Sequence, residues 1–339
     1  MTLRQAQGER DIGIIGGGAW GTALAQVMAS DGSDVLLWAH EGEVVDSINS
    51  AHANPAFLPG IALAPGIRAT ATLADLAACS IILGVAPAQH LAALLGQLPG
   101  NGQPIILCAK GMEQASGRLM CDVAADAGWA GPIAVLSGPT FAHEVGAGLP
   151  AAVTLACADE GIAAQLAARI ARPGFRPYVS SDVIGAEIGG VVKNVLAIAC
   201  GVVDGAGLGQ NARAALISRG FAEMIRYGLA RGAMLETLAG LAGLGDLVLT
   251  CSSTRSRNFS LGRSLGEGGD ARDLLANSAT VAEGAYSAAI LVEDAAKRGV
   301  DMPICTAVAG LIAGTIKASD AIAALLARPL KREGWAALD

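Results

Sequence analysis

Lys193 has the sequence surroundings that proton-transfer chemistry requires. It lies in residues 187–207, which are apolar almost all round and are therefore expected to form a buried helix. Burial disfavours the charged form of a lysine and lowers its pKa toward the range useful for proton transfer. A structural alternative stays open, in which the ammonium group reaches the helix end or pairs with Asp204 or Glu187. On this helix one face would carry small and polar side chains, because they recur at intervals of three or four: Gly190, Lys193 with Asn194, Ala197, Gly201 and Asp204.

A second polar cluster lies in residues 240–262, where a glycine-rich turn carrying Asp246 precedes a basic run. The basic run holds the most concentrated phosphate-type donors of the sequence, namely guanidinium forks, an amide and a hydroxyl: Arg255, Ser256, Arg257 and Asn258. The alternative is a solvated basic loop.

Two more groups of polar residues directly follow apolar runs that are expected to be strands. Lys110 comes after the run PIILCA, and Ser137-Gly138-Pro139-Thr140 comes after PIAVL. Ligands of open α/β sheets bind beyond the carboxyl ends of the strands. Turn formation explains the glycines and the proline but not Lys110, which is therefore a candidate ligand contact.

A glycine loop follows the first apolar run, residues 12–15. Gly16, Gly18 and Gly21 form the pattern G-x-G-x-x-G, and the helical run TALAQVMAS follows at once. In this context the glycines allow a tight turn, close approach of a pyrophosphate and close helix packing, with the phosphates at the helix N-terminus. The pattern predicts dinucleotide binding, with a ligand-free turn as the alternative.

The choice between NAD and NADP depends on the tip of the second expected strand, residues 34–38. His40 there is compatible with a ribose 2′-phosphate, whereas the next residue, Glu41, could accept a hydrogen bond from a 2′-hydroxyl. The cofactor is therefore expected to be NADPH or NADH, without a choice between them.

The elements that must position these groups change in character near residue 180. Up to that point short apolar runs alternate with alanine-rich helical stretches, which indicates a parallel sheet built from β-α-β units. Beyond it, long helical stretches cover residues 183–204, 212–231, 234–242, 281–299 and 304–327. We therefore predict an N-terminal α/β Rossmann-type domain over residues 11–180 and an all-helical domain over 181–339. Residues 1–10 are expected to be a disordered leader.

Composition excludes several classes of partner. The 339 residues carry a net charge of −7 with only 23 lysines and arginines, which argues against a nucleic-acid surface. The sequence has no span of roughly 20 apolar residues, so no membrane helix is expected. The seven cysteines form no C-x-x-C pair, which indicates a reducing cytoplasm without a disulfide framework or a metal cluster. We expect a small-molecule substrate, and the alanine- and glycine-rich helices leave room for a homodimer interface.

Six motifs in order make this sequence similar to the NAD(P)-dependent glycerol-3-phosphate dehydrogenase family of bacterial type. They are GGGAWGTALA, LCAKGME, LSGPTFAHEV, VVKNVLAIACGVVDG, GLAGLGDLVLTCSSTRSRN and VAEG, and the match runs from Ile12 to about residue 325. The resemblance implies a Rossmann domain followed by a helical domain like that of 6-phosphogluconate dehydrogenase. It also implies interconversion of glycerone phosphate and sn-glycerol 3-phosphate for glycerophospholipid synthesis.

The resemblance further implies roles for single residues, with Lys193 as the proton acceptor. Substrate contacts would be Lys110, Gly138, Thr140, Asp246, Ser256, Arg257 and Asn258, with Asn194 orienting Lys193 or the substrate. Cofactor contacts would be Trp20, His40, Lys110, Ala142, Arg257, Val281 and Glu283, beside the loop residues Gly16, Gly18, Ala19 and Gly21. Ala19 departs from the family pattern, because many relatives have a hydroxyl residue there.

Two other functions remain open at this point. A related dehydrogenase acting on a β-hydroxyacid or ketopantoate would need residues that bind a carboxylate and none that bind a phosphate. The 256–258 cluster therefore argues against it. A noncatalytic NAD-sensing protein would have no need of Lys193.

Overall fold

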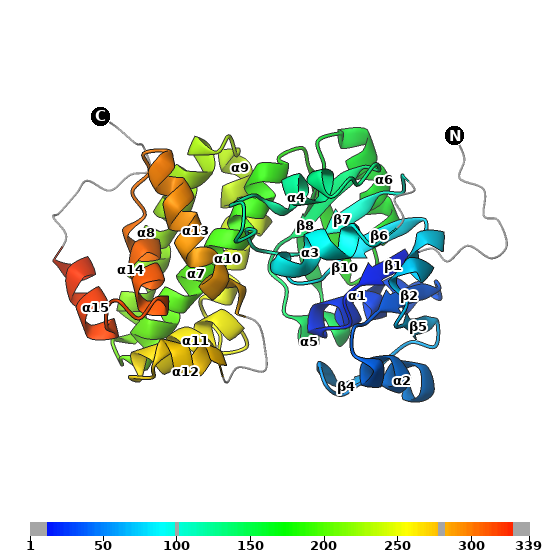
Figure 1. Cartoon of the computed structure of the whole chain (residues 1–339), viewed down its shortest axis with the longest axis horizontal. Helices are drawn as coiled ribbons and strands as arrows, with labels where there is room; N and C mark the ends of the chain where they lie inside the picture. The colour runs from blue at the N-terminus through cyan, green and yellow to red at the C-terminus, as the bar shows by residue number, and fades with distance from the viewer. Residues whose placement is uncertain (1–11, 99–101, 277–281, 328–339) are drawn as a thin grey trace. The chain divides into compact units, whose positions relative to one another are not determined.

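The computed structural model describes residues 12–98, 102–276 and 282–327. Within these residues the chain forms two compact units. The sheet unit lies in Met1–Ala109, Met120–Leu136 and Thr140–Ser181, and the helical unit in Lys110–Leu119, Ser137–Pro139 and Asp182–Asp339. The predicted fold class, a Rossmann-type sheet followed by a helical part, is confirmed (Figure 1). Two short segments at or just after the ends of sheet strands, residues 110–119 and 137–139, group with the helices.

The sheet unit is built on an eight-stranded sheet with the order β10-β9-β8-β7-β6-β1-β2-β5. Strand β1 pairs in parallel with both β2 and β6, so the order reverses at the carboxyl end of β1, where dinucleotides bind in such sheets. The helices and strands of the sheet unit are, in chain order, β1 (Ile12–Ile15), α1 (Ala19–Met28), β2 (Val35–Trp38), α2 (Gly42–Ala51), β3 (Ala53–Asn54), β4 (Leu58–Ala62), β5 (Ile67–Thr70), β6 (Ile81–Gly84), α3 (Ala88–Leu95), β7 (Ile105–Leu107), α4 (Met120–Asp126), β8 (Ile133–Ser137), α5 (Ala142–Gly146), β9 (Ala151–Ala156), α6 (Glu160–Ile170) and β10 (Phe175–Ser180). Short 3₁₀ turns lie at Ala29–Asp31 and Leu73–Ala78.

The strands that the sequence did not predict are the two edge strands, β5 and β10, and the small antiparallel pair β3–β4. An edge strand is partly exposed, so it lacks the continuous apolar run of a central strand. Arg68 in β5 and Tyr178 in β10 are exposed. Strand β10 contains Pro177, and a proline is tolerated there because the strand lies at the edge of the sheet.

The helical unit is organised around α7 (Val183–Gly205), the buried helix predicted from its all-round apolar sequence. It packs against α8 (Gly209–Ala230), α10 (Asp246–Thr250), α11 (Arg257–Gly266), α13 (Glu283–Lys297) and α14 (Pro303–Ile312), as Figure 1 shows. The remaining elements are α9 (Leu235–Ala239), a π-helical turn (Leu241–Gly245), α12 (Ala271–Ala276) and α15 (Ala318–Leu326). The stretch predicted as one helix over 304–327 is two helices, because the chain turns at Gly314 with a φ of 69°.

Helices α7 and α11 approach each other at glycines on both sides. A Cβ atom on Gly201 would lie 2.1 Å from the carbonyl oxygen of Phe259, and one on Gly262 would lie 2.0 Å from that of Ile198. Gly205 and Gly266 face equally close backbone one turn further along. The two backbones therefore touch without intervening side chains, which explains the small residues at positions 201 and 205.

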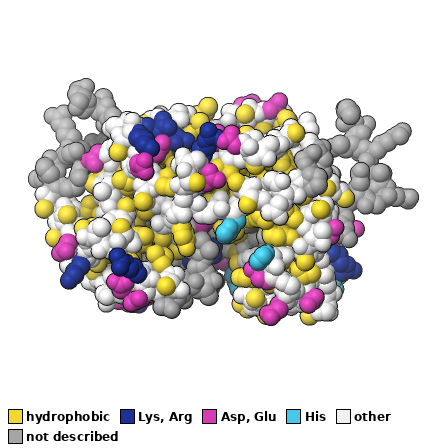
Figure 2. All heavy atoms as spheres, viewed as in Figure 1, with side chains coloured by type: hydrophobic (Ala, Val, Ile, Leu, Met, Phe, Trp, Pro, Cys, Tyr) yellow, Lys and Arg dark blue, Asp and Glu magenta, His cyan; other side chains and the backbone are white. Residues whose placement is uncertain are grey.

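Helix α7 is also long and apolar enough to cross a membrane by length and composition, but 89% of its most apolar window is buried inside the protein. A helix buried to this extent is typical of a protein core, so α7 is interpreted as a core helix. On the face drawn in Figure 2, basic side chains lie beside acidic ones. Exposed ion pairs one helical turn apart, such as Lys297–Glu293 at 2.8 Å, also bring opposite charges together.

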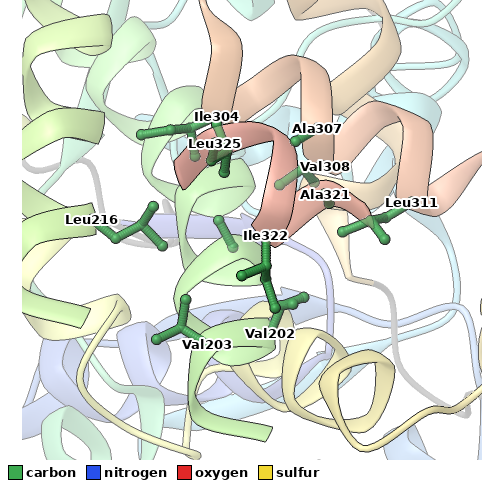
Figure 3. A pocket seen from close by; sticks show the side chains of 11 residues that line it. Val202, Val203, Leu216, Ile304, Ala307, Val308, Leu311, Ala321, Ile322 and Leu325 are labelled. Atoms are coloured by element: carbon green, nitrogen blue, oxygen red, sulfur yellow. The ribbon is translucent and has the colours of Figure 1, made fainter. Parts of the chain in front are cut away.

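A cavity of about 30 Å³ lies among α7, α8, α14 and α15 (Figure 3). It is lined by alanine, valine, leucine and isoleucine side chains, among them Val203, Leu216 and Ile322. A space of that size holds about one water molecule, and its lining offers no polar partner. None of the predicted site residues lines it.

Candidate active site

Two lysines and one aspartate form a cluster within the helical unit, in which Lys193 and Asp246 are buried and Lys110 is partly buried. Lys193 Nζ lies 2.8 Å from Asp246 Oδ1, and Lys110 Nζ lies 2.7 Å from Asp246 Oδ2. Lys110 also donates to the carbonyl oxygen of Gly138 at 3.0 Å. The structure therefore brings together four of the predicted site residues from four separate parts of the sequence. Asp246, and not Asp204, is the carboxylate that pairs with Lys193; Asp204 instead pairs with Arg213 at 3.5 Å.

Local backbone features place the cluster. The π-helical turn Leu241–Gly245 comes directly before Asp246, the first residue of α10. This turn lies against α7, where a Cβ on Gly189 would be 2.3 Å from the carbonyl oxygen of Ala242. One residue on, a Cβ on Gly190 would be 3.1 Å from Lys110 Cγ. Glycines at 189 and 190 thus let Asp246 and Lys110 approach α7 closely. A single π turn is a frequent feature of functional sites.

Burial and charge set the protonation of the cluster. Burial lowers the pKa of Lys193 to about 8, although the attraction of Asp246 opposes this shift and the repulsion of Lys110 adds to it. Burial by itself would raise the pKa of Asp246, but Lys110 and Lys193 together hold that pKa below its ordinary value. Asp246 is therefore an anion at neutral pH, and Lys193 can both lose and regain a proton near it.

Thr250 belongs to the cluster and was missed in the sequence. Its hydroxyl accepts from Lys193 Nζ at 2.9 Å and donates to Asp246 Oδ1 at 3.2 Å. Thr250 lies four residues after Asp246 on the short helix α10, so both side chains share one face. That spacing was the available signal, but it has meaning only once residues 246–250 are known to be helical.

The two asparagines of the predicted site hydrogen-bond to each other. Asn258 Nδ2 donates to Asn194 Oδ1 at 3.0 Å, and Asn194 Nδ2 donates to the main-chain oxygen of Lys110 at 3.0 Å. Asn194 was expected to orient Lys193 or the substrate. The hydrogen bonds of its side chain go to Asn258 and to the main-chain oxygen of Lys110, and its role toward Lys193 or the substrate stays a prediction.

The N-terminus of α11 carries the predicted phosphate donors. Ser256 caps the helix, its Oγ accepting from the main-chain N–H of Phe259 at 3.2 Å, so its own O–H remains able to donate. Arg257 and Arg255 are exposed, whereas Asn258 is buried. A guanidinium group at the positive end of a helix suits an anion such as phosphate.

The glycine loop has the shape that a dinucleotide requires. Gly16 has a φ of 120°, and a Cβ on Gly21 would be 1.9 Å from the Gly16 oxygen, so both positions need glycine. The space beside Gly18 is open, and this N-cap residue of α1 offers no side-chain cap, which leaves the first N–H groups of the helix for a ligand. Ala19 supplies no hydroxyl to this end.

Other residues of the sheet unit support the loop. Asn54 Nδ2 donates to the Gly17 oxygen at 2.8 Å and to the hydroxyl of Thr22 at 2.8 Å. These two hydrogen bonds hold the main chain of the glycine loop in place. Neither residue was predicted. The indole Nε1 of Trp20 is buried and has no partner among the described residues. An orphaned donor beside an open helix N-terminus fits a ligand with acceptor atoms, as a dinucleotide has.

The structure places the remaining predicted residues as follows. His40 and Glu41 follow β2 and are exposed, as expected for a strand tip. Thr140 and Ala142 lie before and at the start of α5 in the sheet unit, and Glu283 is the first residue of α13 in the helical unit. Val281 lies outside the described residues.

Fold and site together define an NAD(P)-dependent oxidoreductase, with a Rossmann-type sheet, an open glycine loop and a buried lysine paired with a carboxylate. The family models of the NAD-dependent glycerol-3-phosphate dehydrogenase N-terminus and C-terminus match residues 11–163 and 182–323. The chain belongs to this family, as the resemblance in the sequence implied.

Individual relatives agree with this assignment. The chain is 64% identical over 323 residues to a glycerol-3-phosphate dehydrogenase [NAD(P)+] of Erythrobacter litoralis, covering 95% of this chain and 98% of the relative. It is 59% identical to the protein of that name from Caulobacter vibrioides, covering 95% and 98%. The crystal structure of glycerol-3-phosphate dehydrogenase from Coxiella burnetii superposes with a TM-score of 0.89 at 38% identity, covering 94% of this chain and 99% of that one.

Proposed function

We propose that the protein interconverts glycerone phosphate and sn-glycerol 3-phosphate with NADPH or NADH, and that it supplies glycerophospholipid synthesis. The observation that carries the proposal is the Lys193–Asp246–Lys110 cluster, because it puts a lysine of pKa about 8 against a buried carboxylate. The bound cofactor supplies or accepts the hydride at C2 of the substrate. The protein must then give or take one proton at the C2 oxygen.

Lys193 is the proposed proton donor in the reductive direction. An ammonium group has three N–H donors, and two of those on Lys193 go to Asp246 and Thr250. The third can stabilise the negative charge growing on the carbonyl oxygen and pass its proton to it. The neutral amine left behind keeps its bonds to Asp246 and Thr250, and in the oxidative direction its lone pair accepts the proton of the hydroxyl.

Lys110 is the proposed second contact of the substrate oxygens. Two of its N–H donors are used by Gly138 and Asp246, so one remains for a ligand. Its positive charge also disfavours the charged form of Lys193. Lys110 therefore assists proton release from Lys193, while Asp246 keeps Lys193 in place.

The experiment that tests the function is a comparison of initial rates. Purified protein is mixed with glycerone phosphate and either NADH or NADPH, and the fall in nicotinamide absorbance is followed against a control without substrate. Oxidation of neither cofactor above that control would contradict the proposal and favour a noncatalytic NAD-sensing protein. Faster reaction with ketopantoate would favour the hydroxyacid alternative.

Arg257 is proposed to grip the substrate phosphate from the N-terminus of α11. Charge-assisted hydrogen bonds contribute on the order of 1.5 to 3 kcal/mol. Arg257→Ala should therefore lower kcat/KM for glycerone phosphate at least about tenfold, at roughly 1.4 kcal/mol per decade. Dihydroxyacetone lacks the phosphate, so its poor turnover should change little.

Two measurements separate the roles proposed for Arg257. The resemblance also makes it a cofactor contact, so the affinity for NADPH is measured on the same variant. Equal losses for both substrates with unchanged cofactor affinity would show that Arg257 does not hold the phosphate.

The cofactor is proposed to lie on the glycine loop, Gly16, Gly18, Ala19, Trp20 and Gly21, with further contacts from Lys110, Ala142, Arg257, Val281 and Glu283. His40, at the tip of β2, is proposed to lie beside the adenosine ribose. His40→Asp should then shift the ratio of kcat/KM for NADPH to that for NADH toward NADH, because a carboxylate repels a 2′-phosphate and accepts from a 2′-hydroxyl. An unchanged ratio would mean that the ribose lies elsewhere.

We further propose residues 11–180 as the cofactor domain and residues 181–339 as the substrate domain. By their contacts, Lys110–Leu119 and Ser137–Pro139 would act with the substrate domain. Thr140 is proposed as a further substrate contact. We also propose a cytoplasmic homodimer, on the sequence grounds given above, and its mass in solution can be measured by light scattering.

A further inference from the structure

A continuous series of hydrogen bonds runs through four segments of the helical unit and ends at Lys110. The main-chain N–H of Gly284, in the first turn of α13, donates to Asn258 Oδ1 at 3.0 Å. Asn258 Nδ2 on α11 donates to Asn194 Oδ1 on α7 at 3.0 Å, and Asn194 Nδ2 donates to the Lys110 oxygen at 3.0 Å. Each of these bonds joins a different pair of segments.

The hydrogen-bond partners at the two ends of this series determine the orientation of both asparagine amides. A main-chain N–H must face an oxygen, so Gly284 determines which side of the Asn258 amide is Oδ1. Asn258 Nδ2 must then face the Asn194 oxygen, and Asn194 Nδ2 must face the carbonyl of Lys110. Neither amide can flip without placing two donors or two acceptors together. Both asparagines are also buried, with exposed fractions of 7% for Asn258 and 6% for Asn194.

Close backbone packing supports the series. A Cβ on Gly284 would lie 2.5 Å from the main-chain oxygen of Asn194, so α13 and α7 touch at this point. The amide of Asn258 is thus held from two helices, and it has only one further N–H to offer a ligand. Such a side chain is arranged to hold its neighbours more than to grip a flexible phosphate.

We propose that Asn258 is a positioning residue, which fixes the main chain of Lys110 through Asn194 and acts on the reaction apart from any contact with the substrate phosphate. The inference rests on the function proposed above. Lys110 has to keep its main chain in place so that Nζ can reach both Asp246 and the Gly138 oxygen. Loss of Asn258 frees Asn194, and the segment that carries Lys110 then shifts.

The test compares two substrates in two variants. Asn258→Ala removes both bonds, and Asn258→Asp keeps the acceptor for Gly284 but loses the donor to Asn194 in a side chain of nearly the same shape. Displacements of about 1 Å in an active site can cost roughly 100-fold in rate. We therefore expect kcat for dihydroxyacetone to fall by about 10- to 100-fold in both variants, together with kcat for glycerone phosphate.

Arg263→Ala is the matched control, because it removes an exposed side chain of the same helix that pairs only with surface carboxylates, and it should leave kcat unchanged for both substrates. If Asn258 only bound the phosphate, its variants would lose activity with glycerone phosphate while the rate with dihydroxyacetone stayed unchanged. That result would overturn the proposal. Melting temperatures of all three variants show whether a loss reflects unfolding, and Asn258→Asp provides the answer if Asn258→Ala does not fold.

Two further measurements do not depend on the size of the activity. Acetic anhydride labelling, read by peptide mass spectrometry, should modify Lys110 faster in Asn258→Ala than in the parent, relative to the exposed Lys317. This readout holds even if the parent turns over no glycerone phosphate, so it separates failure of this proposal from failure of the function. In an active enzyme, moving the positive charge of Lys110 away should shift the pH limit of the reductive rate upward, because Lys110 lowers the pKa of Lys193. Unchanged labelling and an unchanged pH limit would contradict the proposal.

Discussion

Lys193→Met should lower kcat for the reduction of glycerone phosphate by roughly 10²- to 10⁴-fold, the usual contribution of general acid catalysis. Methionine keeps much of the volume of the lysine in the core of α7 but has no proton to give. Asp246 keeps its ion pair with Lys110 at 2.7 Å, so its carboxylate is not left as an unpaired buried charge. Initial rates at saturating NADPH measure the effect.

The control for this variant is cofactor binding. The glycine loop belongs to the sheet unit, whereas Lys193 belongs to the helical unit, so the affinity for NADPH in a fluorescence titration should stay close to that of the parent. A variant that keeps most of its kcat would exclude Lys193 as the proton donor. A variant that loses its affinity for NADPH would leave the fall in kcat without a chemical interpretation.

Asp246→Asn should have the second large effect, on both stability and pH dependence. Removing one partner of a buried ion pair typically costs about 3–5 kcal/mol, and here two lysines lose the same carboxylate. The attraction that raises the pKa of Lys193 disappears, so this pKa should fall below about 8. Reduction needs the ammonium form, so its rate, which in the parent should decline above pH 8, should decline at lower pH in the variant.

Chemical denaturation and a pH series of kcat check this prediction. Asp204→Asn is a suitable matched variant, because Asp204 pairs with Arg213 near the surface and should contribute little to either quantity. An unchanged pH limit in Asp246→Asn would mean that Asp246 does not control the protonation of Lys193. A free energy of unfolding equal to that of the parent would mean that the lysines find other partners.

The cofactor loop and the central helix could be predicted because their constraints are local. Gly16 and Gly21 are required by the backbone within a few residues, and an apolar sequence on every face of a helix has few alternatives to burial. The central strands could also be predicted, because a strand that is buried on both faces is a short apolar run. Edge strands such as β10 have only one neighbour, so their sequence carries less of the pattern.

The partners within the site could not be predicted from spacing, because they depend on tertiary contacts. Lys193 and Asp246 are 53 residues apart, and nothing local distinguished Asp246 from Asp204 as the partner of the lysine. Thr250 and Asn54 each have an ordinary sequence context, and their roles follow only from the elements that they face. The resemblance to the family gave the residues, but the hydrogen bonds between Asn194, Asn258 and Lys110 required the structure.

The glycine contact between α7 and α11 fixes the separation of two groups that are proposed to bind opposite ends of the substrate. Lys193 lies on α7, and the proposed phosphate grip lies at the N-terminus of α11. Because Gly201 and Gly262 leave no space for a side chain, the register of the two helices is set by main-chain contact and cannot be adjusted by repacking. The distance from the proposed proton donor to the proposed phosphate contact is therefore set by the backbone, and a keto-phosphate of another chain length would not match it.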